Sequence, residues 1–186
     1  MNTAVKEISA VFKALSFAAL KHSSQRRKDK SATPYINHPI DVAYILWEIG
    51  KVRDLDIITA AILHDTLEDT DTTAEEIDAQ FGVKIRKIVE EVSDDKNLPK
   101  EERKQYQIDH TDGLSFSARN IKLADKICNI EDLIESPPVD WSEERMIDYA
   151  VWGYEVVKKL KGTNLKLERF FEGLYSTGMV ALRKKK

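Results

Sequence analysis

Apolar residues recur at three- and four-residue spacing along most of the chain, and this spacing is typical of helices with one buried face. In the first such stretch, residues 5–21, the apolar positions include Ile8, Val11, Phe12, Leu15, Ala18 and Ala19. No stretch shows the long alternation of apolar and polar residues that half-buried strands require. The pattern therefore predicts an all-α fold.

Proline, glycine and polar clusters divide the chain into further helices. Residues 22–37 are expected to form a polar loop, with or without a short hairpin. The next helix is expected from His38 to Gly50, with Asn37 as its cap, and the one after it from Asp54 to near Thr70. The later helices are expected at 72–82, 83–92, 99–108, 115–134, 141–161 and 164–175.

Length and composition narrow the class of protein. The 186 residues suit one domain with one core, so residues 1–186 are expected to form a single domain, with a frayed basic tail at 176–186. A net charge of −3 argues against a general nucleic-acid binder, which would be strongly basic. The one cysteine, Cys128, permits no internal disulfide, and no apolar run approaches the roughly 18 residues of a membrane span.

The N-terminal residues also lack the apolar core of a secretory signal. We therefore expect a cytosolic protein with a small-molecule partner and with neither nucleic acid nor membrane as a partner. The sequence does not predict its oligomeric state.

A run of apolar residues that suddenly turns polar is the most informative stretch. Ala60–Leu63 is followed by His64 and by three carboxylates, Asp65, Glu68 and Asp69. Helical residues four apart share a face, so His64 would lie under Glu68 and Asp65 under Asp69. Three carboxylates and an imidazole are hard to accommodate in so small a volume unless a cation lies between them. This stretch therefore indicates a metal site.

Two distant residues extend the candidate set of metal ligands. His38 lies at the start of the preceding predicted helix, and Asp125 lies on a polar stripe of the helix predicted at 115–134. Two imidazoles and two carboxylates suit Mn²⁺, Fe²⁺ or Zn²⁺ better than Mg²⁺, which prefers oxygen ligands alone. His22 and His110 have no carboxylate three or four residues away, so neither is a candidate.

The motifs around these residues resemble a known family. His38, His64–Asp65 and Asp125 match the H…HD…D pattern of the HD-domain metal phosphohydrolases. The longer matches are Arg27–Asp29, Pro34–Pro39, His64–Thr70, and Lys122–Lys126 with Asn129. Together they resemble the hydrolase domain of the bifunctional alarmone synthetase/hydrolases. The likeness covers about residues 15–175 and is closest to the small stand-alone alarmone hydrolases.

This resemblance implies an HD-type helical bundle that removes the 3′-pyrophosphate from guanosine 3′,5′-bis(diphosphate) or its 5′-triphosphate form, with one Mn²⁺ as cofactor. The metal ligands that it implies are His38, His64, Asp65 and Asp125. It implies Glu68 and Asp69 as the catalytic acidic pair. The substrate contacts that it implies are Arg27, Lys28, Asn129, Arg145 and Tyr149. Asp132 departs from the long bifunctional enzymes, which tend to carry at this position a hydroxyl residue that contacts the ribose.

Other interpretations of the same residues stay open. An HD phosphatase acting on another nucleotide with a 2′- or 3′-phosphate, such as NADPH, would use a similar pocket. A non-catalytic nucleotide sensor is disfavoured because binding alone does not need the Glu68–Asp69 pair. Taken singly, the basic run Arg26–Lys28 is typical of a solvated loop, and Trp141 and Tyr149 are typical of a core.

Overall fold

The structure, a computed structural model, describes residues 3–183 as an array of helices. The elements, in chain order, are α1 (Thr3–Lys21), α2 (Asn37–Glu48), α3 (Leu55–Leu63), α4 (Thr66–Asp69), α5 (Ala74–Phe81), α6 (Val83–Val92), α7 (Lys100–His110), the 3-10 helix η1 (Thr111–Gly113), α8 (Phe116–Glu135), α9 (Glu143–Lys159) and α10 (Leu165–Arg183). Within this range the one β-type pairing outside the helices is a bridge between Arg26 and Pro34 in the loop after α1. The prediction of an all-α fold is confirmed.

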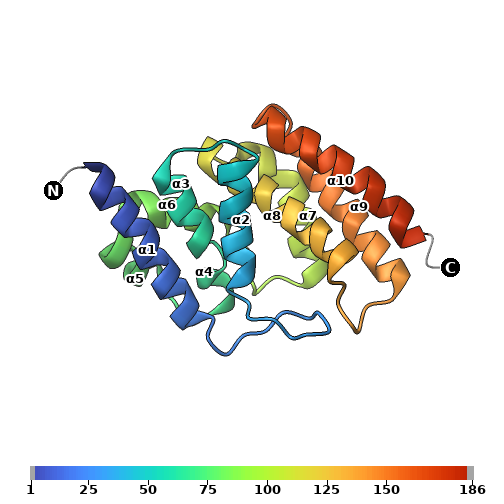
Figure 1. Ribbon diagram of the computed structural model, residues 1–186, viewed down its shortest axis with the longest axis horizontal. Helices are drawn as coiled ribbons and strands as arrows, with labels where there is room; N and C mark the ends of the chain where they lie inside the picture. Colours follow the sequence, from blue (N-terminus) through green and yellow to red (C-terminus); the bar gives the residue numbers. More distant parts are fainter. Residues whose placement is uncertain (1–2, 184–186) are drawn as a thin grey trace.

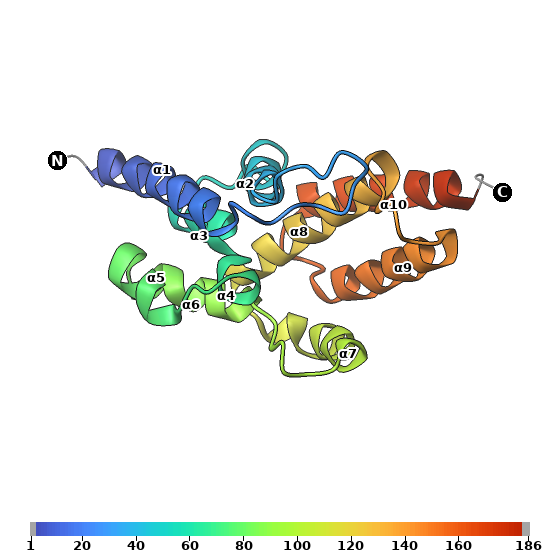
Figure 2. The same cartoon turned by 90° about the horizontal axis from the view of Figure 1, so that it is seen from below.

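The long helix α8 runs through the middle of the array (Figure 2), and in the view of Figure 1 α2 lies between α3 and α8. α8 packs against α2, α6, α9 and α10, whereas α3 packs against α1, α2 and α6. Their buried apolar side chains join one hydrophobic cluster, which includes Leu46, Ile62, Leu123, Ile127 and Phe171. Because α2, α3 and α8 meet in this cluster, the polar residues at their ends and along α8 are brought to a common place.

The helix predicted from Asp54 to near Thr70 is in fact two helices, which is a correction. α3 ends at Leu63, and the short α4 begins at Thr66. The Thr66 hydroxyl donates to the carbonyl of Leu63 at 2.7 Å, and the backbone N–H of His64 bonds Ala61, three residues back instead of four. These bonds replace the regular helical ladder, and the apolar periodicity gave no sign of them. His64 and Asp65 therefore lie in a turn between two helices.

Side chains cap two helices close to their predicted starts, whereas the cap predicted at Asn37 is wrong. Asp54 caps α3 by accepting a bond from the backbone N–H of Asp56 at 2.9 Å, and Thr73 accepts one from Glu76 at 3.2 Å. Asn37, in contrast, is the first residue of α2, and no side chain caps that helix. α2 therefore begins directly at the loop that carries the basic residues.

The frayed tail predicted at 176–186 is wrong over most of its length. α10 continues through this segment to Arg183 because Met179 and Leu182 pack into the hydrophobic cluster. Gly178 lies close against Ile134 of α8, so close that an added Cβ would come within 2.6 Å of its side chain. Residues 184–186 of the predicted tail lie outside the described part of the chain.

Candidate active site

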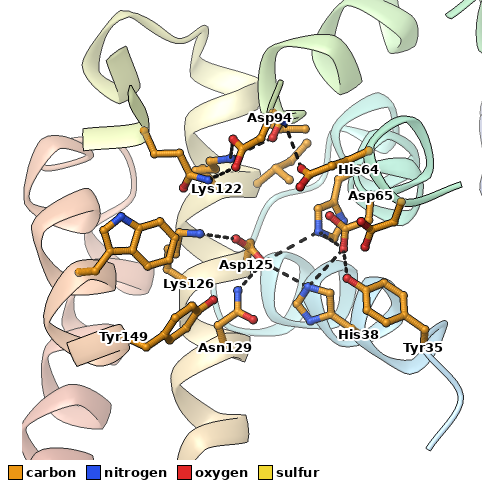
Figure 3. Close-up of a pocket in the computed structure, with 16 residues that line it drawn as sticks. Tyr35, His38, His64, Asp65, Asp94, Lys122, Asp125, Lys126, Asn129 and Tyr149 are labelled. Atoms are coloured by element: carbon orange, nitrogen blue, oxygen red, sulfur yellow. Dashed lines mark hydrogen bonds and ion pairs between the residues drawn. The ribbon is translucent and has the colours of Figure 1, made fainter. Parts of the chain in front are cut away.

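Four side chains from three segments that are far apart in the sequence converge at the centre of the fold (Figure 3). His38, His64 and Asp65 place donor atoms within 4.8 Å of one another. Asp65 Oδ2 is 3.1 Å from His64 Nε2 and 3.7 Å from His38 Nε2. Asp125, on α8, brings Oδ1 to 3.2 Å from His38 Nε2 and 3.9 Å from His64 Nε2. Adjacent ligands of an octahedral ion lie about 3 Å apart, so these separations are those of a site that could hold a divalent cation.

The hydrogen bonding of His64 fits a metal ligand. Its Nδ1 lies 2.7 Å from the carbonyl oxygen of Ala61, which can only accept, so Nδ1 carries the hydrogen. The lone pair of Nε2 then faces Asp65 and Asp125, and this buried nitrogen has no hydrogen-bond partner among the described residues. Metal-ligating histidines commonly donate through one ring nitrogen in this way and bind through the other.

The electrostatics of the cluster also favour a bound cation. Burial opposes protonation of His64, but the carboxylates of Asp65 and Asp125 raise its pKa to about 9. Burial likewise opposes ionisation of Asp65, but the two imidazoles hold its pKa far below the usual range. The pocket thus attracts positive charge, which a divalent ion would supply in place of the imidazole proton.

Three further side chains hold the carboxylates in place. The Tyr35 hydroxyl donates to Asp65 Oδ2 at 2.7 Å. Lys126 Nζ donates to Asp125 Oδ2 at 3.0 Å, and Asn129 Nδ2 donates to Asp125 Oδ1 at 2.7 Å. Such partners of metal ligands fix their orientation. The sequence interpretation gave no role to Tyr35, although it lies in the matched segment before His38, and none to Lys126, which follows Asp125 directly.

Glu68 and Asp69, predicted as the catalytic pair, line a cavity of about 210 Å³. The four candidate metal ligands line the same cavity. Glu68 accepts a hydrogen bond from the backbone N–H of Asp94 at 3.1 Å. Burial, together with the carboxylates of Asp94 and Asp65, raises the pKa of Glu68 to about 7. A carboxylate with a pKa near neutrality is suited to take a proton from water.

Asp69 is held by two side chains from different loops. Gln25 Nε2 donates to Asp69 Oδ2 at 3.1 Å, and Lys96 forms an ion pair with Oδ1. Lys96 lies in the loop between α6 and α7, and Gln25 lies in the loop after α1. Both contacts join segments far apart in the chain, so spacing along the sequence gave no sign of them.

A second cavity of about 440 Å³ adjoins the first and contains most of the residues predicted to bind substrate. Both cavities are lined by Asn129 and Tyr149, and the second adds Arg27 and Lys28. Lys28 is exposed, and its carbonyl accepts a bond from the backbone of Val139 at 3.0 Å, which ties the basic loop to the connection between α8 and α9. This cavity therefore opens beside the candidate metal ligands under a basic rim.

Asp132 lies in this second cavity, where it forms an ion pair with Arg27. Burial raises its pKa, and the Arg27 guanidinium counters that rise. The structure thus places at this position a carboxylate that holds the basic loop, in contrast to the hydroxyl residue typical of the long enzymes.

Arg145 lies apart from the predicted substrate contacts Arg27, Lys28 and Asn129, in a third cavity that Tyr149 and Trp141 also line. Its guanidinium lies 4.3 Å from the centre of the Trp141 ring. Tyr149 borders all three cavities, and burial raises its pKa to about 12, so its hydroxyl keeps its proton and can donate. Trp141 and Tyr149, interpreted from sequence as typical core residues, lie at the walls of these cavities.

The described helices contain none that is long and apolar enough to cross a membrane.

Comparisons with known proteins identify the family to which this chain belongs. A family model described as HD domain matches residues 14–148. The chain is 48% identical over 176 residues to guanosine-3′,5′-bis(diphosphate) 3′-pyrophosphohydrolase MESH1 of Xenopus tropicalis, covering 95% of this chain and 98% of that protein. It is 48% identical to the protein of the same name from Homo sapiens, covering 91% of this chain and 94% of that one.

A solved structure described as a metazoan orthologue of SpoT that hydrolyses ppGpp superimposes with a TM-score of 0.88 at 42% identity, covering 90% of this chain and 94% of that one. The chain belongs to the HD-domain family and, within it, to the family of the MESH1 proteins.

Proposed function

We propose that this protein is a cytoplasmic, Mn²⁺-dependent guanosine-3′,5′-bis(diphosphate) 3′-pyrophosphohydrolase built as a single domain. One structural observation carries the proposal. The donor atoms of His38, His64 and Asp65 cluster within 4.8 Å, and the carboxylates of Glu68 and Asp69 line the same cavity. The activity named for the MESH1 relatives, which match nearly the whole chain, supports this assignment.

His38, His64, Asp65 and Asp125 would hold one Mn²⁺, whose preference for mixed nitrogen and oxygen ligands suits this set. When bound, such an ion supplies positive charge that polarises a phosphoryl oxygen and acidifies water. The protein contributes the geometry of this site. His64 is oriented by the Ala61 carbonyl, and Asp65 is oriented by the Tyr35 hydroxyl.

Glu68 and Asp69 would act on the attacking water. The water oxygen forms a bond to the phosphorus attached to ribose O3′, and the bond from that phosphorus to O3′ breaks. A proton of the water passes to a carboxylate of the pair and is then released to solvent, and O3′ leaves as the hydroxyl of GDP or GTP after taking up a proton from solvent. Pyrophosphate is the other product. Glu68 can act as this acceptor, because it lines the cavity of the metal ligands, and burial with the nearby carboxylates raises its pKa to about 7.

The second cavity would receive the nucleoside and its 5′-phosphates. Arg27 and Lys28 border it with positive charge, which favours a polyphosphate, and Asn129 and Tyr149 offer an amide and a hydroxyl at the junction with the metal cavity. Arg145 lies in the adjoining third cavity, where a 5′-phosphate could reach its guanidinium. These side chains position the substrate and do not take part in bond breaking.

The test is a nucleotide panel with product analysis. Purified protein with Mn²⁺ is given guanosine 3′,5′-bis(diphosphate), its 5′-triphosphate form and NADPH, and pyrophosphate and orthophosphate are quantified separately. We expect pyrophosphate from the first two and a matching amount of GDP or GTP. Orthophosphate from NADPH with no pyrophosphate from the guanosine compounds would identify the phosphatase instead. Substrate binding without any turnover would identify a sensor.

A further inference from the structure

A hydrogen-bonded chain reaches the candidate catalytic pair from the loop after α1. His22 Nδ1 lies 2.7 Å from Gln25 Oε1, and Gln25 Nε2 donates to Asp69 Oδ2 at 3.1 Å. His22 and Gln25 both lie just beyond α1, which ends at Lys21, whereas Asp69 ends α4. The chain thus connects a buried histidine to a carboxylate in the candidate active site.

The direction of each bond in this chain is fixed by chemistry. An ionised Asp69 can only accept, so the amide nitrogen of Gln25 faces it and the amide oxygen faces His22. The oxygen in turn can only accept, so His22 Nδ1 carries a hydrogen. If the amide were turned over, its oxygen would face the carboxylate, and two acceptors would be in contact. The bonds to His22 and Asp69 therefore specify one orientation of the Gln25 amide, which places its N–H against Asp69 Oδ2.

His22 is a rigid anchor for this chain. The side chain is 1% exposed, and its ring lies 5.0 Å from the ring of Tyr35, which itself bonds Asp65. His22 Nε2 is buried without a partner among the described residues. Leaving a buried nitrogen unpaired is unfavourable, and an apolar ring would avoid that cost, so the donor at Nδ1 is what distinguishes histidine at this position.

We propose that His22 and Gln25 are positioning residues that hold Asp69 in the orientation needed for its work on the attacking water; this rests on the function proposed above. Gln25 is half-buried and borders the second cavity, where it could also touch substrate. His22 is too deeply buried to do so, and therefore its effect on turnover passes through its neighbours. Its hydrogen bond leads through Gln25 to Asp69, whereas its ring contact with Tyr35 leads to Asp65, so an unchanged Mn²⁺ content identifies the route through Gln25. The other partner of Asp69, Lys96, has a side chain 48% exposed and holds the carboxylate less rigidly.

The first experiment separates turnover from binding. His22→Phe keeps a ring but removes the donor, and we expect kcat to fall roughly 10- to 100-fold while KM and Mn²⁺ content stay unchanged. His22→Asn offers an amide N–H near the position of Nδ1 and should recover most of that loss. The matched control is His110→Phe on exposed α7, which should leave kcat unaltered. Melting temperatures show that each variant is folded at the assay temperature.

The second experiment tests whether the effect passes through Asp69. In an Asp69→Asn background, His22→Phe should cause no further loss of kcat, because the residue that it positions no longer acts. An equal loss in both backgrounds, or a full kcat in His22→Phe alone, would overturn the positioning role. If His22→Phe fails to fold, Gln25→Met takes its place in the same cycle. Normal turnover by Asp69→Asn itself would instead refute the catalytic role in the proposed function, so the two failures can be told apart.

Discussion

Lys126 and its neighbour Asp125 form a buried, hydrogen-bonded ion pair, with Nζ 3.0 Å from Oδ2. This bond occupies one carboxylate oxygen and leaves Oδ1 to face His38. The ammonium also lies 4.4 Å from the centre of the Trp152 ring, whose Nε1 donates to the carbonyl of Lys104. α7 and α9 thereby support the orientation of a candidate metal ligand on α8.

Lys126→Met should weaken Mn²⁺ binding about 10- to 100-fold, the usual effect of removing a partner that orients a ligand. Removing the positive charge of a lysine near the ion would by itself strengthen Mn²⁺ binding. Lys122→Met controls for this, because Lys122 lines the same cavity but donates to the Val92 carbonyl and not to Asp125. Calorimetric titration with Mn²⁺ measures both variants. Unchanged or tighter binding by Lys126→Met would show that charge outweighs positioning.

The sequence identified the helices well because each carries its own apolar periodicity and its own breaking residues. It failed where the outcome depends on contacts that only the folded chain makes. The break between α3 and α4 depends on the Thr66 hydroxyl, and the length of α10 depends on packing against Ile134 of α8. Neither contact changes the spacing of apolar residues along the chain, so neither can be recognised from that spacing.

The candidate metal ligands could be named from the sequence because they lie in short motifs with family likeness. His22 was set aside because no carboxylate lies three or four residues away, whereas its connection to Asp69 runs through Gln25, 44 residues from that carboxylate. Lys126 and Tyr35 lie beside motif residues, yet their bonds to Asp125 and Asp65 depend on side-chain direction. Spacing along the chain carries no such information.

Glu68→Gln and Asp69→Asn should lower kcat on the order of 10²–10⁴-fold while Mn²⁺ content stays at the level of the unaltered protein. The amides keep the size of the side chains, so packing should survive. Glu68→Gln keeps an acceptor for the Asp94 N–H, whereas Asp69→Asn keeps an acceptor for Gln25 or for Lys96 but not for both. Steady-state kinetics and metal analysis test this together. Asp71→Asn, two residues further along and almost fully exposed, should behave as the unaltered protein. Near-normal turnover by both amide variants would remove the proposed base.

Lys28→Ala should raise KM about tenfold or more with little change in kcat. An ammonium on the rim of the second cavity would contact a 5′-phosphate equally in the ground state and the transition state, so its loss weakens binding alone. Lys30→Ala is the matched control, since Lys30 is exposed in the same loop but does not border this cavity. Equal KM values for the two variants would show that Lys28 contacts solvent and not the substrate.

Glu131→Gln should stabilise the protein increasingly as the pH rises. Half-burial, with Glu135, Asp132 and Asp41 nearby, raises the pKa of Glu131 from 4.5 to about 7 in the folded protein. Below pH 4.5 the carboxyl is neutral in both states, and between pH 4.5 and about 7 only the folded state holds the proton. The stability of the protein therefore falls as the pH rises through this window, while the carboxylate becomes ionised in its half-buried site.

The advantage of the uncharged glutamine in melting temperature should accordingly be small at pH 5 and largest at pH 8, with chelator present throughout. The control Glu102→Gln, on exposed α7, should show no such trend. A difference that stays constant with pH would contradict the raised pKa.

The most direct test of the account is the metal dependence of pyrophosphate release from guanosine 3′,5′-bis(diphosphate). Chelator should abolish release by the unaltered protein, and added Mn²⁺ should restore it. His64→Ala should bind little Mn²⁺ and release no pyrophosphate when Mn²⁺ is added, because it lacks the unpaired Nε2 that faces the two carboxylates. Full release in chelator with no metal bound, or normal release by His64→Ala, would contradict a metal-dependent pyrophosphohydrolase at this site.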